Sequence, residues 1–211
     1  MPAIRSLRTA DRDALYAICL KTGLAGADAT HLYRDPEVIG HVYAGPYATL
    51  APGTAFVVED EEGVGGYILG VEDTYKFEKR LETEWWPPLR VRYGDAANVP
   101  RDKQTPDERM STLIHHPVRT PRRISEPYPA HLHINLLPRL QGKGWGKRLI
   151  DRLLEAMREK GSRGLHLGVG TANARAVEFY RAYGFEEVER TSPEFGVIFF
   201  GIRLDASAAR E

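Results

Sequence analysis

The 211-residue chain has only one cysteine and no formal net charge, and each of these facts excludes a class of protein. With Cys19 alone, the chain forms no intrachain disulfide and no zinc-thiolate site, so we expect a reducing compartment. Its 29 Lys and Arg residues balance 29 Asp and Glu residues, which excludes the broad basic field of nucleic-acid and anionic-membrane binders. Cys19 itself is expected to fill the core and not to act as a nucleophile.

Long apolar runs are also missing. No stretch approaches the roughly 18 apolar residues that span a bilayer, and the charged residues 1–13 contain no apolar signal-peptide region. The sequence therefore predicts a soluble, cytoplasmic protein that binds neither membrane nor nucleic acid. Its apolar content of 42% is enough for a core, which excludes a disordered chain.

The hydrophobic periodicity predicts an α/β fold. Two β-branched and aromatic segments flank turn residues and form a clear hairpin at 54–71. Before this hairpin we expect a strand within 2–8, a helix starting after Thr9 and a short helix at 35–43. After residue 130 the expected order is strand, helix, strand, helix and hairpin, at 131–137, 144–160, 164–170, 173–183, 185–189 and 196–204.

The segment 74–129 differs from the rest of the chain in its proline content. Between 87 and 129 it contains eight of the fourteen prolines. Because proline removes a backbone donor and breaks regular elements, we expect short helices at 75–83 and 106–113 joined by irregular loops. A linker between two domains is the alternative.

We interpret this segment as an insertion because Trp85 and Trp86 are too apolar to be left in solvent. The predicted organisation is one domain at 1–205, followed by a tail at 206–211. One tryptophan is expected to hold the insertion on the sheet. Whether the other lines an acceptor pocket stays open.

A glycine-rich run follows the strand expected at 131–137. Residues 141–146 read Gln-Gly-Lys-Gly-Trp-Gly, and three glycines are costly unless backbone N–H groups must approach something closely. Free N–H groups at a helix N-terminus, with lysines nearby, bind phosphate. The spacing excludes the P-loop and the dinucleotide-binding G-x-G-x-x-G motif. A tight turn that needs glycine only for its geometry is the alternative.

A second candidate binding surface lies on the helix that begins near Asn173. Asn173, Ala176 and Tyr180 fall at i, i+3 and i+7, on one stripe about 10 Å long at about 1.5 Å per residue. They are therefore able to contact two points of one extended ligand. The alternative is that Asn173 only caps the helix. For Phe179 and Tyr183 we prefer a core position, because large aromatic side chains are mostly buried.

These motifs resemble those of the Gcn5-related N-acetyltransferase (GNAT) family. Gln141, Gly144 and Gly146 match its acetyl-CoA pyrophosphate motif Q/R-x-x-G-x-G/A, and the run N-A-R-A-V-E-F-Y-R-A-Y-G-F is similar to its fourth-helix signature. The resemblance implies a single domain with a mixed, mostly antiparallel sheet of about seven strands flanked by helices. It also implies direct transfer of acetyl from acetyl-CoA to an amine in a ternary complex.

The same resemblance assigns roles to individual residues. Loop amides would hold the pyrophosphate, backbone N–H groups at the end of the preceding strand would meet pantetheine and the thioester, and Tyr180 would protonate the leaving thiolate. The expected cofactor-binding residues are Asn135, Leu136, Leu137, Gln141, Gly142, Lys143, Gly144, Trp145, Gly146, Lys147, Asn173, Ala176 and Tyr180.

The general base is harder to assign. An alkyl amine with a pKa of about 10.4 is mostly protonated at neutral pH, so the reaction needs a carboxylate or imidazole nearby. His133 is the candidate, with His131 on the same face of the expected strand. Glu59 and Glu72 are rivals, and a strand histidine without a chemical role is the alternative. No metal site is expected, because the histidines have no well-placed acidic ligand.

A closer resemblance covers residues 56–74, the Trp-Pro-containing stretch after them, and residues 161–185. These segments are similar to the C-terminal acetyltransferase-like domain of eukaryotic O-GlcNAcase, a degenerate relative described as lacking the glycine-rich loop that this chain retains. A non-catalytic acyl-CoA-binding or protein-interaction module is therefore the alternative to an enzyme. The sequence does not indicate the oligomeric state, or whether the acceptor is a small amine or a protein lysine.

Overall fold

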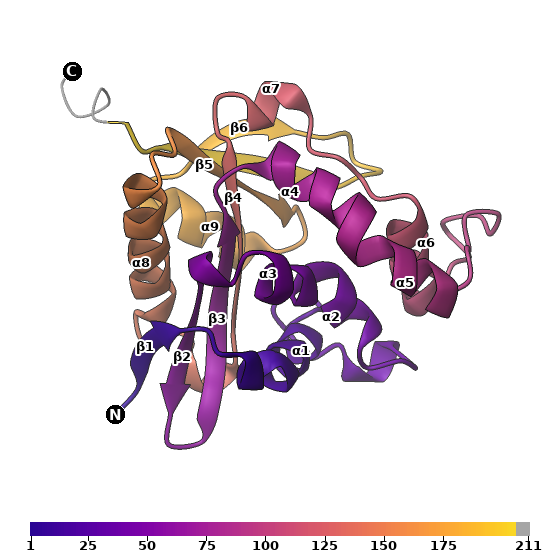
Figure 1. Cartoon of the computed structure of the whole chain (residues 1–211), viewed down its shortest axis with the longest axis horizontal. Coiled ribbons are helices and arrows are strands. Elements are labelled where there is room, and N and C mark those ends of the chain that lie inside the picture. Colours follow the sequence, from indigo (N-terminus) through magenta and orange to yellow (C-terminus); the bar gives the residue numbers. More distant parts are fainter. Residues whose placement is uncertain (206–211) are drawn as a thin grey trace.

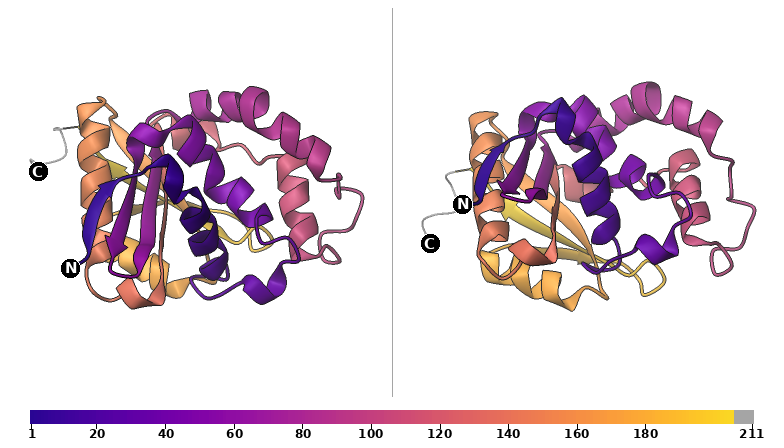
Figure 2. Two further views of the ribbon diagram at one scale, coloured as in Figure 1. Left: turned by 60° about the horizontal axis from the view of Figure 1, so that its bottom comes forward. Right: turned by 90° about the horizontal axis from the view of Figure 1, so that it is seen from below.

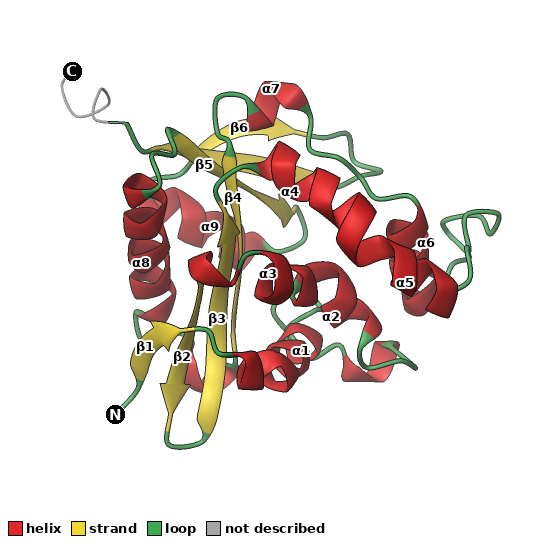
Figure 3. Ribbon diagram, in the orientation of Figure 1, coloured by secondary structure: helices red, strands yellow, loops and turns green. Residues whose placement is uncertain are grey.

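The computed structural model describes residues 1–205, so the expected tail at 206–211 lies outside the described residues. The strands are β1 (Ala3–Ser6), β2 (Ala55–Asp60), β3 (Gly63–Val71), β4 (Ala130–Leu136), β5 (Gly164–Gly170), β6 (Glu186–Arg190) and β7 (Val197–Arg203). They form one sheet in the order β1-β2-β3-β4-β5-β7-β6 (Figures 1 and 3). Among the described strands only β4 and β5 pair in parallel, which confirms the expected mixed and mostly antiparallel sheet.

Helices cover both faces of this sheet. Their bounds are α1 (Arg12–Lys21), α2 (Val38–Tyr43), α3 (Gly45–Leu50), α4 (Thr74–Arg80), α5 (Trp86–Arg92), α6 (Pro106–His115), α7 (Arg122–Ser125), α8 (Trp145–Glu159) and α9 (Ala174–Tyr183). Side chains of α8 and α9 share one hydrophobic cluster with the sheet, and side chains of α1 to α6 share another. No helix within residues 1–205 is long and apolar enough to cross a bilayer.

The alternation along β3 explains this two-layered core. Ile68 faces α8, whereas Tyr67 and Leu69 face the layer of α1 to α6, and all three are fully buried. Gly70 lets α8 approach closely, because a Cβ atom there would lie 2.8 Å from a methyl carbon of Leu153. Burying a side chain such as Leu153 contributes about 1.5–3 kcal/mol, so this contact fixes α8 on the sheet.

The insertion at 74–129 packs on the same core as the sheet. Trp86 and Leu89 of α5 and Ile114 of α6 are buried in the cluster that contains the inward-facing residues of β3. Figure 2 shows α4, α5 and α6 on the side of the molecule opposite α8. The expected helix at 106–113 is present as α6.

Helix α5 was not expected from the sequence. Pro87 and Pro88 lie in its first turn, where a missing N–H group leaves no intrahelical bond unmade. Proline therefore begins this helix where the sequence suggested irregular chain. Helix α3, for which the sequence yields no prediction, likewise has a proline, Pro46, in its first turn.

Strands β4 and β5 are joined over a short distance only. They pair through Ala130 with Leu165 and His131 with His166, and then diverge (Figure 1). β3 continues to pair with β4 as far as Leu136, and β7 pairs with the whole of β5. Within residues 1–205, the segments 132–136 of β4 and 167–170 of β5 therefore have no strand partner on their facing edges. We call this region the splay.

Candidate active site

The loop at 141–147 joins β4 to α8. Gly142 (φ 71°) and Gly144 (φ 79°) adopt left-handed backbone conformations, which other residues reach only with strain. The backbone N–H groups of 142–147 find no hydrogen-bond acceptor in the described part of the chain. They lie at the positive end of a 15-residue helix, and a Cβ atom on Gly142 or Gly144 would meet nothing within 4 Å. The loop is therefore open and suited to bind an anion such as phosphate.

The third glycine of the loop serves packing. A Cβ atom on Gly146 would lie 3.1 Å from the ring of Phe179 on α9 and 3.7 Å from a methyl carbon of Leu136 on β4. The absence of a side chain lets α8, α9 and the end of β4 converge. The sequence predicted close ligand approach for all three glycines, and for Gly146 the neighbouring helix is the reason instead.

Alternate backbone groups of β4 face the splay. The Leu137 N–H group donates to the Gly65 carbonyl at 2.8 Å. Because bonded and non-bonded pairs alternate along an antiparallel ladder, the backbone of Asn135 also bonds β3, while Ile134 and Leu136 point into the splay. β3 thus uses the N–H group of Leu137 and, by this alternation, that of Asn135, whereas the N–H group of Leu136 faces the splay. The N–H donation to a cofactor that the sequence predicts is therefore best supported for Leu136.

The Asn135 side chain turns toward the layer of α1. Its Nδ2 atom donates to Thr22 Oγ1 at 2.6 Å, and the Thr22 hydroxyl donates to the Ile18 carbonyl at 2.6 Å. Asn135 therefore ties β4 to the end of α1. The two hydrogen bonds hold the wall of the splay in place from the face opposite α8.

Gln141 connects the end of β4 to α9. Its Nε2 atom donates to the Leu136 carbonyl at 2.7 Å, and its Oε1 atom accepts from Arg175 Nη1 at 2.6 Å. Asn173 caps α9, because its Oδ1 atom accepts from the Ala176 N–H group at 3.1 Å. This cap matches the structural alternative for Asn173 and uses only the amide oxygen.

The remaining predicted loop residues differ in their pairing. Lys143 is exposed, and Lys147 Nζ lies 2.8 Å from a carboxylate oxygen of Asp151. Trp145 packs against the core, with the Arg148 guanidinium 4.6 Å above its ring centre. Lys147 therefore already has a counter-charge on its own helix.

Tyr180 is more enclosed than the sequence predicted. Its side chain is 8% exposed and packs among Phe179, Phe185 and Phe200, with ring centroids 5.4–6.1 Å away. Its hydroxyl forms no hydrogen bond within residues 1–205 and still reaches solvent. Burial raises its pKa, so the hydroxyl is protonated at neutral pH. Phe179 and Tyr183, predicted to be core residues, are half-buried.

His131 is fixed by hydrogen bonds on both sides of its ring. Its Nε2 atom lies 2.7 Å from Tyr47 Oη and its Nδ1 atom 2.8 Å from Thr74 Oγ1. The Thr74 hydroxyl donates to the Pro129 carbonyl at 2.8 Å, so it accepts from Nδ1–H, and Nε2 accepts from Tyr47. His131 is thus neutral, and burial lowers its pKa well below the usual value. Sequence reasoning missed these partners, which lie 57 and 84 residues away in the chain.

His133 lies just past the last β4–β5 residue pair. Its ring is half-buried between Tyr43 and Tyr47, at centroid distances of 5.7 and 5.1 Å, and forms no hydrogen bond with the described residues. Burial, with a smaller effect of the His166 charge, lowers the pKa of His133 to about 4. The imidazole is therefore neutral at pH 7, and its one unprotonated ring nitrogen can accept a proton.

The rival carboxylates are occupied by cations. Glu59 Oε2 lies 2.6 Å from Arg5 Nε, and this contact lowers the pKa of Glu59. Glu72 lies 3.2 Å from Lys160 Nζ. Neither carboxylate is placed to take a proton from an amine at the splay, which leaves His133 as the candidate base.

Two further paired histidines, His115 and His116, belong to the insertion. His115 Nε2 lies 2.7 Å from the Tyr93 carbonyl, and His116 Nε2 lies 2.7 Å from Asp95. Across residues 1–205 no three histidine, cysteine or carboxylate side chains are grouped to hold a metal ion. These histidines connect parts of the insertion to one another.

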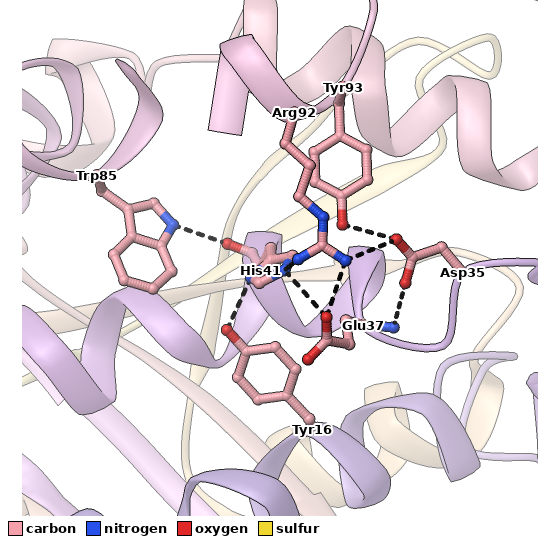
Figure 4. Close-up of polar contacts among 7 residues, drawn as sticks. All are labelled: Tyr16, Asp35, Glu37, His41, Trp85, Arg92 and Tyr93. Atoms are coloured by element: carbon pink, nitrogen blue, oxygen red, sulfur yellow. Dashed lines mark hydrogen bonds and ion pairs between the residues drawn. The ribbon is translucent and has the colours of Figure 1, made fainter. Parts of the chain in front are cut away.

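A cluster of polar side chains joins the insertion to the layer of α1 and α2. We call it the His41 cluster (Figure 4), and its members are Tyr16, Asp35, Glu37, His41, Trp85, Arg92 and Tyr93. His41 Nδ1 lies 2.9 Å from Tyr16 Oη, and His41 Nε2 accepts from Arg92 Nη1 at 3.3 Å. Because arginine only donates, this contact fixes His41 as neutral. Burial lowers the pKa of His41 accordingly.

Contacts in this cluster show that the adjacent Trp85 and Trp86 have different structural roles. Trp85 Nε1 donates to the His41 carbonyl at 2.9 Å, and Arg92 also binds Glu37 at 2.9 Å. Trp86 is 4% exposed in the core. Trp86 is thus the residue that holds the insertion on the sheet, and Trp85 anchors it to α2.

Comparisons with known proteins agree with this geometry. A profile of the acetyltransferase (GNAT) family matches residues 111–185, the part of the chain that contains β4, the loop at 141–147, and α9. The crystal structure of SsHAT has a TM-score of 0.87 and 39% sequence identity, covering 97% of this chain and 98% of that one. A putative acetyltransferase from Salmonella typhimurium with its cofactor acetyl-CoA has a TM-score of 0.56 at 17% identity, covering 100% of this chain and 98% of that chain.

Curated proteins also match. Protein O-GlcNAcase from Rattus norvegicus is 25% identical over 189 residues, which cover 89% of this chain and 20% of that protein. Protein O-GlcNAcase from Mus musculus matches to the same extent. The chain thus spans about a fifth of the length of these relatives. Together the comparisons confirm the resemblances predicted from the sequence.

Proposed function

Because this chain belongs to the acetyltransferase (GNAT) family, we propose that it transfers an acetyl group from acetyl-CoA to an amine acceptor in a ternary complex. The observation that carries the proposal is the row of free backbone N–H groups at 142–147, next to unpaired backbone groups of β4. The first feature suits the cofactor phosphates, and the second suits its amide-bearing arm. The acceptor is an amine, either of a small molecule or of a protein lysine.

The residues present fit acyl-CoA in two places. Gly142 and Gly144 leave open space over the loop amides, where two negatively charged phosphate groups can approach. The backbone of Ile134 and Leu136 faces the splay and offers donors and acceptors to the extended pantetheine arm. The bound cofactor supplies the activated acyl thioester, and the chain supplies the groups that orient it.

Proton movement is assigned to Tyr180 and His133. The Tyr180 hydroxyl is protonated at neutral pH and has no hydrogen-bond partner among residues 1–205, so it can donate to a leaving thiolate. His133 is neutral and can accept a proton from the attacking amine. With a pKa of about 4 it is too weak a base to deprotonate an ammonium group of pKa about 10.4 efficiently. In this proposal the acceptor therefore enters the site as the neutral amine. His133 then accepts the proton that the amine nitrogen loses after it attacks the thioester.

A non-catalytic acyl-CoA-binding module is the second candidate. The enclosure of Tyr180 and the low pKa of His133 favour it, because both weaken acid–base catalysis. The two functions share the cofactor loop, so binding alone does not separate them.

Release of free CoA from acetyl-CoA, followed with a thiol reagent, separates the two functions. We expect release above the rate of background hydrolysis only when a panel of amines that includes lysine peptides and small polyamines is added. Mass spectrometry then identifies the acetylated amine. Tight acetyl-CoA binding with no amine-dependent release across the panel would establish the binding module instead.

A further inference from the structure

Arg175 is a cation that the local structure does not explain. It is the second residue of α9, where the positive end of the helix dipole disfavours a positive charge. It is exposed, and within residues 1–205 its single hydrogen bond is the one to Gln141, with no carboxylate as counter-charge. Arg181 on the same helix, in contrast, lies 2.7 Å from Glu187.

The packing of α9 places Arg175 beside the loop at 141–147. Arg175 and Phe179 stand at i and i+4, so they lie on one face of the helix. Phe179 contacts the position of Gly146 in the first turn of α8, and Arg175 contacts Gln141 immediately before the loop glycines. The guanidinium is therefore held near the free N–H groups of the loop.

The hydrogen bond to Gln141 leaves most of the guanidinium available. Arginine has five N–H donors, and Gln141 uses one of them. The planar group is suited to bidentate contact with phosphate. Lys147, which the sequence suggested as a phosphate-binding cation, is instead paired with Asp151.

We propose that Arg175 binds the pyrophosphate of the acyl-CoA cofactor and that Gln141 positions the guanidinium for this contact. The inference rests on the proposed function, because it requires acetyl-CoA as the ligand. It adds a cation from α9 to the backbone donors at the start of α8 and to the exposed Lys143 of the loop.

The test is calorimetric binding of acetyl-CoA and of 3′-dephospho-CoA, which keeps the pyrophosphate but lacks the ribose phosphate. Arg175→Gln is expected to lower the affinity for both ligands by about 10- to 100-fold, because hydrogen bonds to a charged group are lost. Arg175→Lys should recover part of this loss. Arg181→Gln is the matched control, an exposed arginine of the same helix, and should bind both ligands as the wild type does.

Gln141 is tested through a double-mutant cycle. Gln141→Ala should weaken acetyl-CoA binding several-fold in the wild type and much less in the Arg175→Gln background. An equal loss in both backgrounds would show that Gln141 acts through Leu136 alone, which overturns its positioning role.

The outcomes of the binding test are distinct. Normal affinity of Arg175→Gln for both ligands overturns the proposal while the proposed function stands. A lower affinity of Arg175→Gln for acetyl-CoA alone would place Arg175 at the ribose phosphate, which also overturns the proposal. A wild-type protein that binds neither ligand refutes the proposed function itself. Thermal unfolding of each variant confirms that the folded protein is measured.

Discussion

Replacing Gly144 by aspartate tests the central claim that the loop at 141–147 binds phosphate. Gly144 precedes α8 with φ 79°, and a Cβ atom there meets nothing within 4 Å, so the new side chain does not clash with the protein. It extends into the space assigned to the pyrophosphate. Two unit charges about 5 Å apart repel by roughly 3 kcal/mol at an effective dielectric constant of about 20. Affinity for acetyl-CoA should therefore fall by about two orders of magnitude.

Gly161→Asp is the matched control for this variant. Gly161 has φ 73° and equally open surroundings, but lies past the C-terminal end of α8. Each substitution adds about 1–2 kcal/mol of backbone strain, which thermal unfolding measures. Gly144→Asn retains the strain and removes the charge. Calorimetry should show the full loss in Gly144→Asp, a smaller loss in Gly144→Asn, whose side chain enters the same space without the charge, and none in Gly161→Asp. Unchanged affinity of Gly144→Asp would refute the assignment of the loop.

The remaining predictions concern other parts of the molecule. Tyr180→Phe should preserve acetyl-CoA affinity and lower kcat by about 100-fold once an acceptor is known, whereas unchanged turnover would support the binding module. The pKa of His133 is lowered from 6.5 to about 4, so the folded state binds this proton less tightly than the unfolded state. The contribution of His133 to the free energy of unfolding is fully present above pH 6.5 and is lost as the pH falls through 4, by up to roughly 3 kcal/mol. The Tm of His133→Gln should therefore depend less steeply on pH than that of the wild type. Identical plots of Tm against pH for the two proteins would contradict the lowered pKa of His133. Limited proteolysis should leave the chain largely intact across 74–129, since that segment shares the core, and excision of two folded fragments would show a linker instead.

The regular elements follow from local signals in the sequence. β5 was predicted at the bounds observed, because a short apolar segment between glycines has few alternatives. The limits of α8 and α9 follow from Gly144 and Asn173, which cap them. Helix α5 is not predicted because proline in the segment 74–129 suggests irregular chain, although it is favourable in a first helical turn.

The site was predictable where it is contiguous in sequence. The loop at 141–147 carries its own motif, whereas the contact of Arg175 with Gln141 joins residues 34 positions apart. The one local sequence feature that points to a role for Arg175 is its position as a cation in the first turn of a helix. The enclosure of Tyr180 was not predictable either, because a helical stripe does not show which of two adjacent aromatic residues the sheet covers.

The short junction between β4 and β5 also determines how the two halves of the sheet open. Within residues 1–205, two residue pairs are the whole strand contact between β1–β4 and β5–β7. A ligand lying in the splay touches both halves and resists their separation. At a concentration of 100 times its Kd it adds about 2.7 kcal/mol against any opening that releases it. Amide hydrogen exchange in β4 and β5 should therefore slow together, and by a similar factor, when acetyl-CoA is added. A cofactor bound in the splay would thus help to hold together two parts of a sheet that are joined by only two residue pairs within residues 1–205.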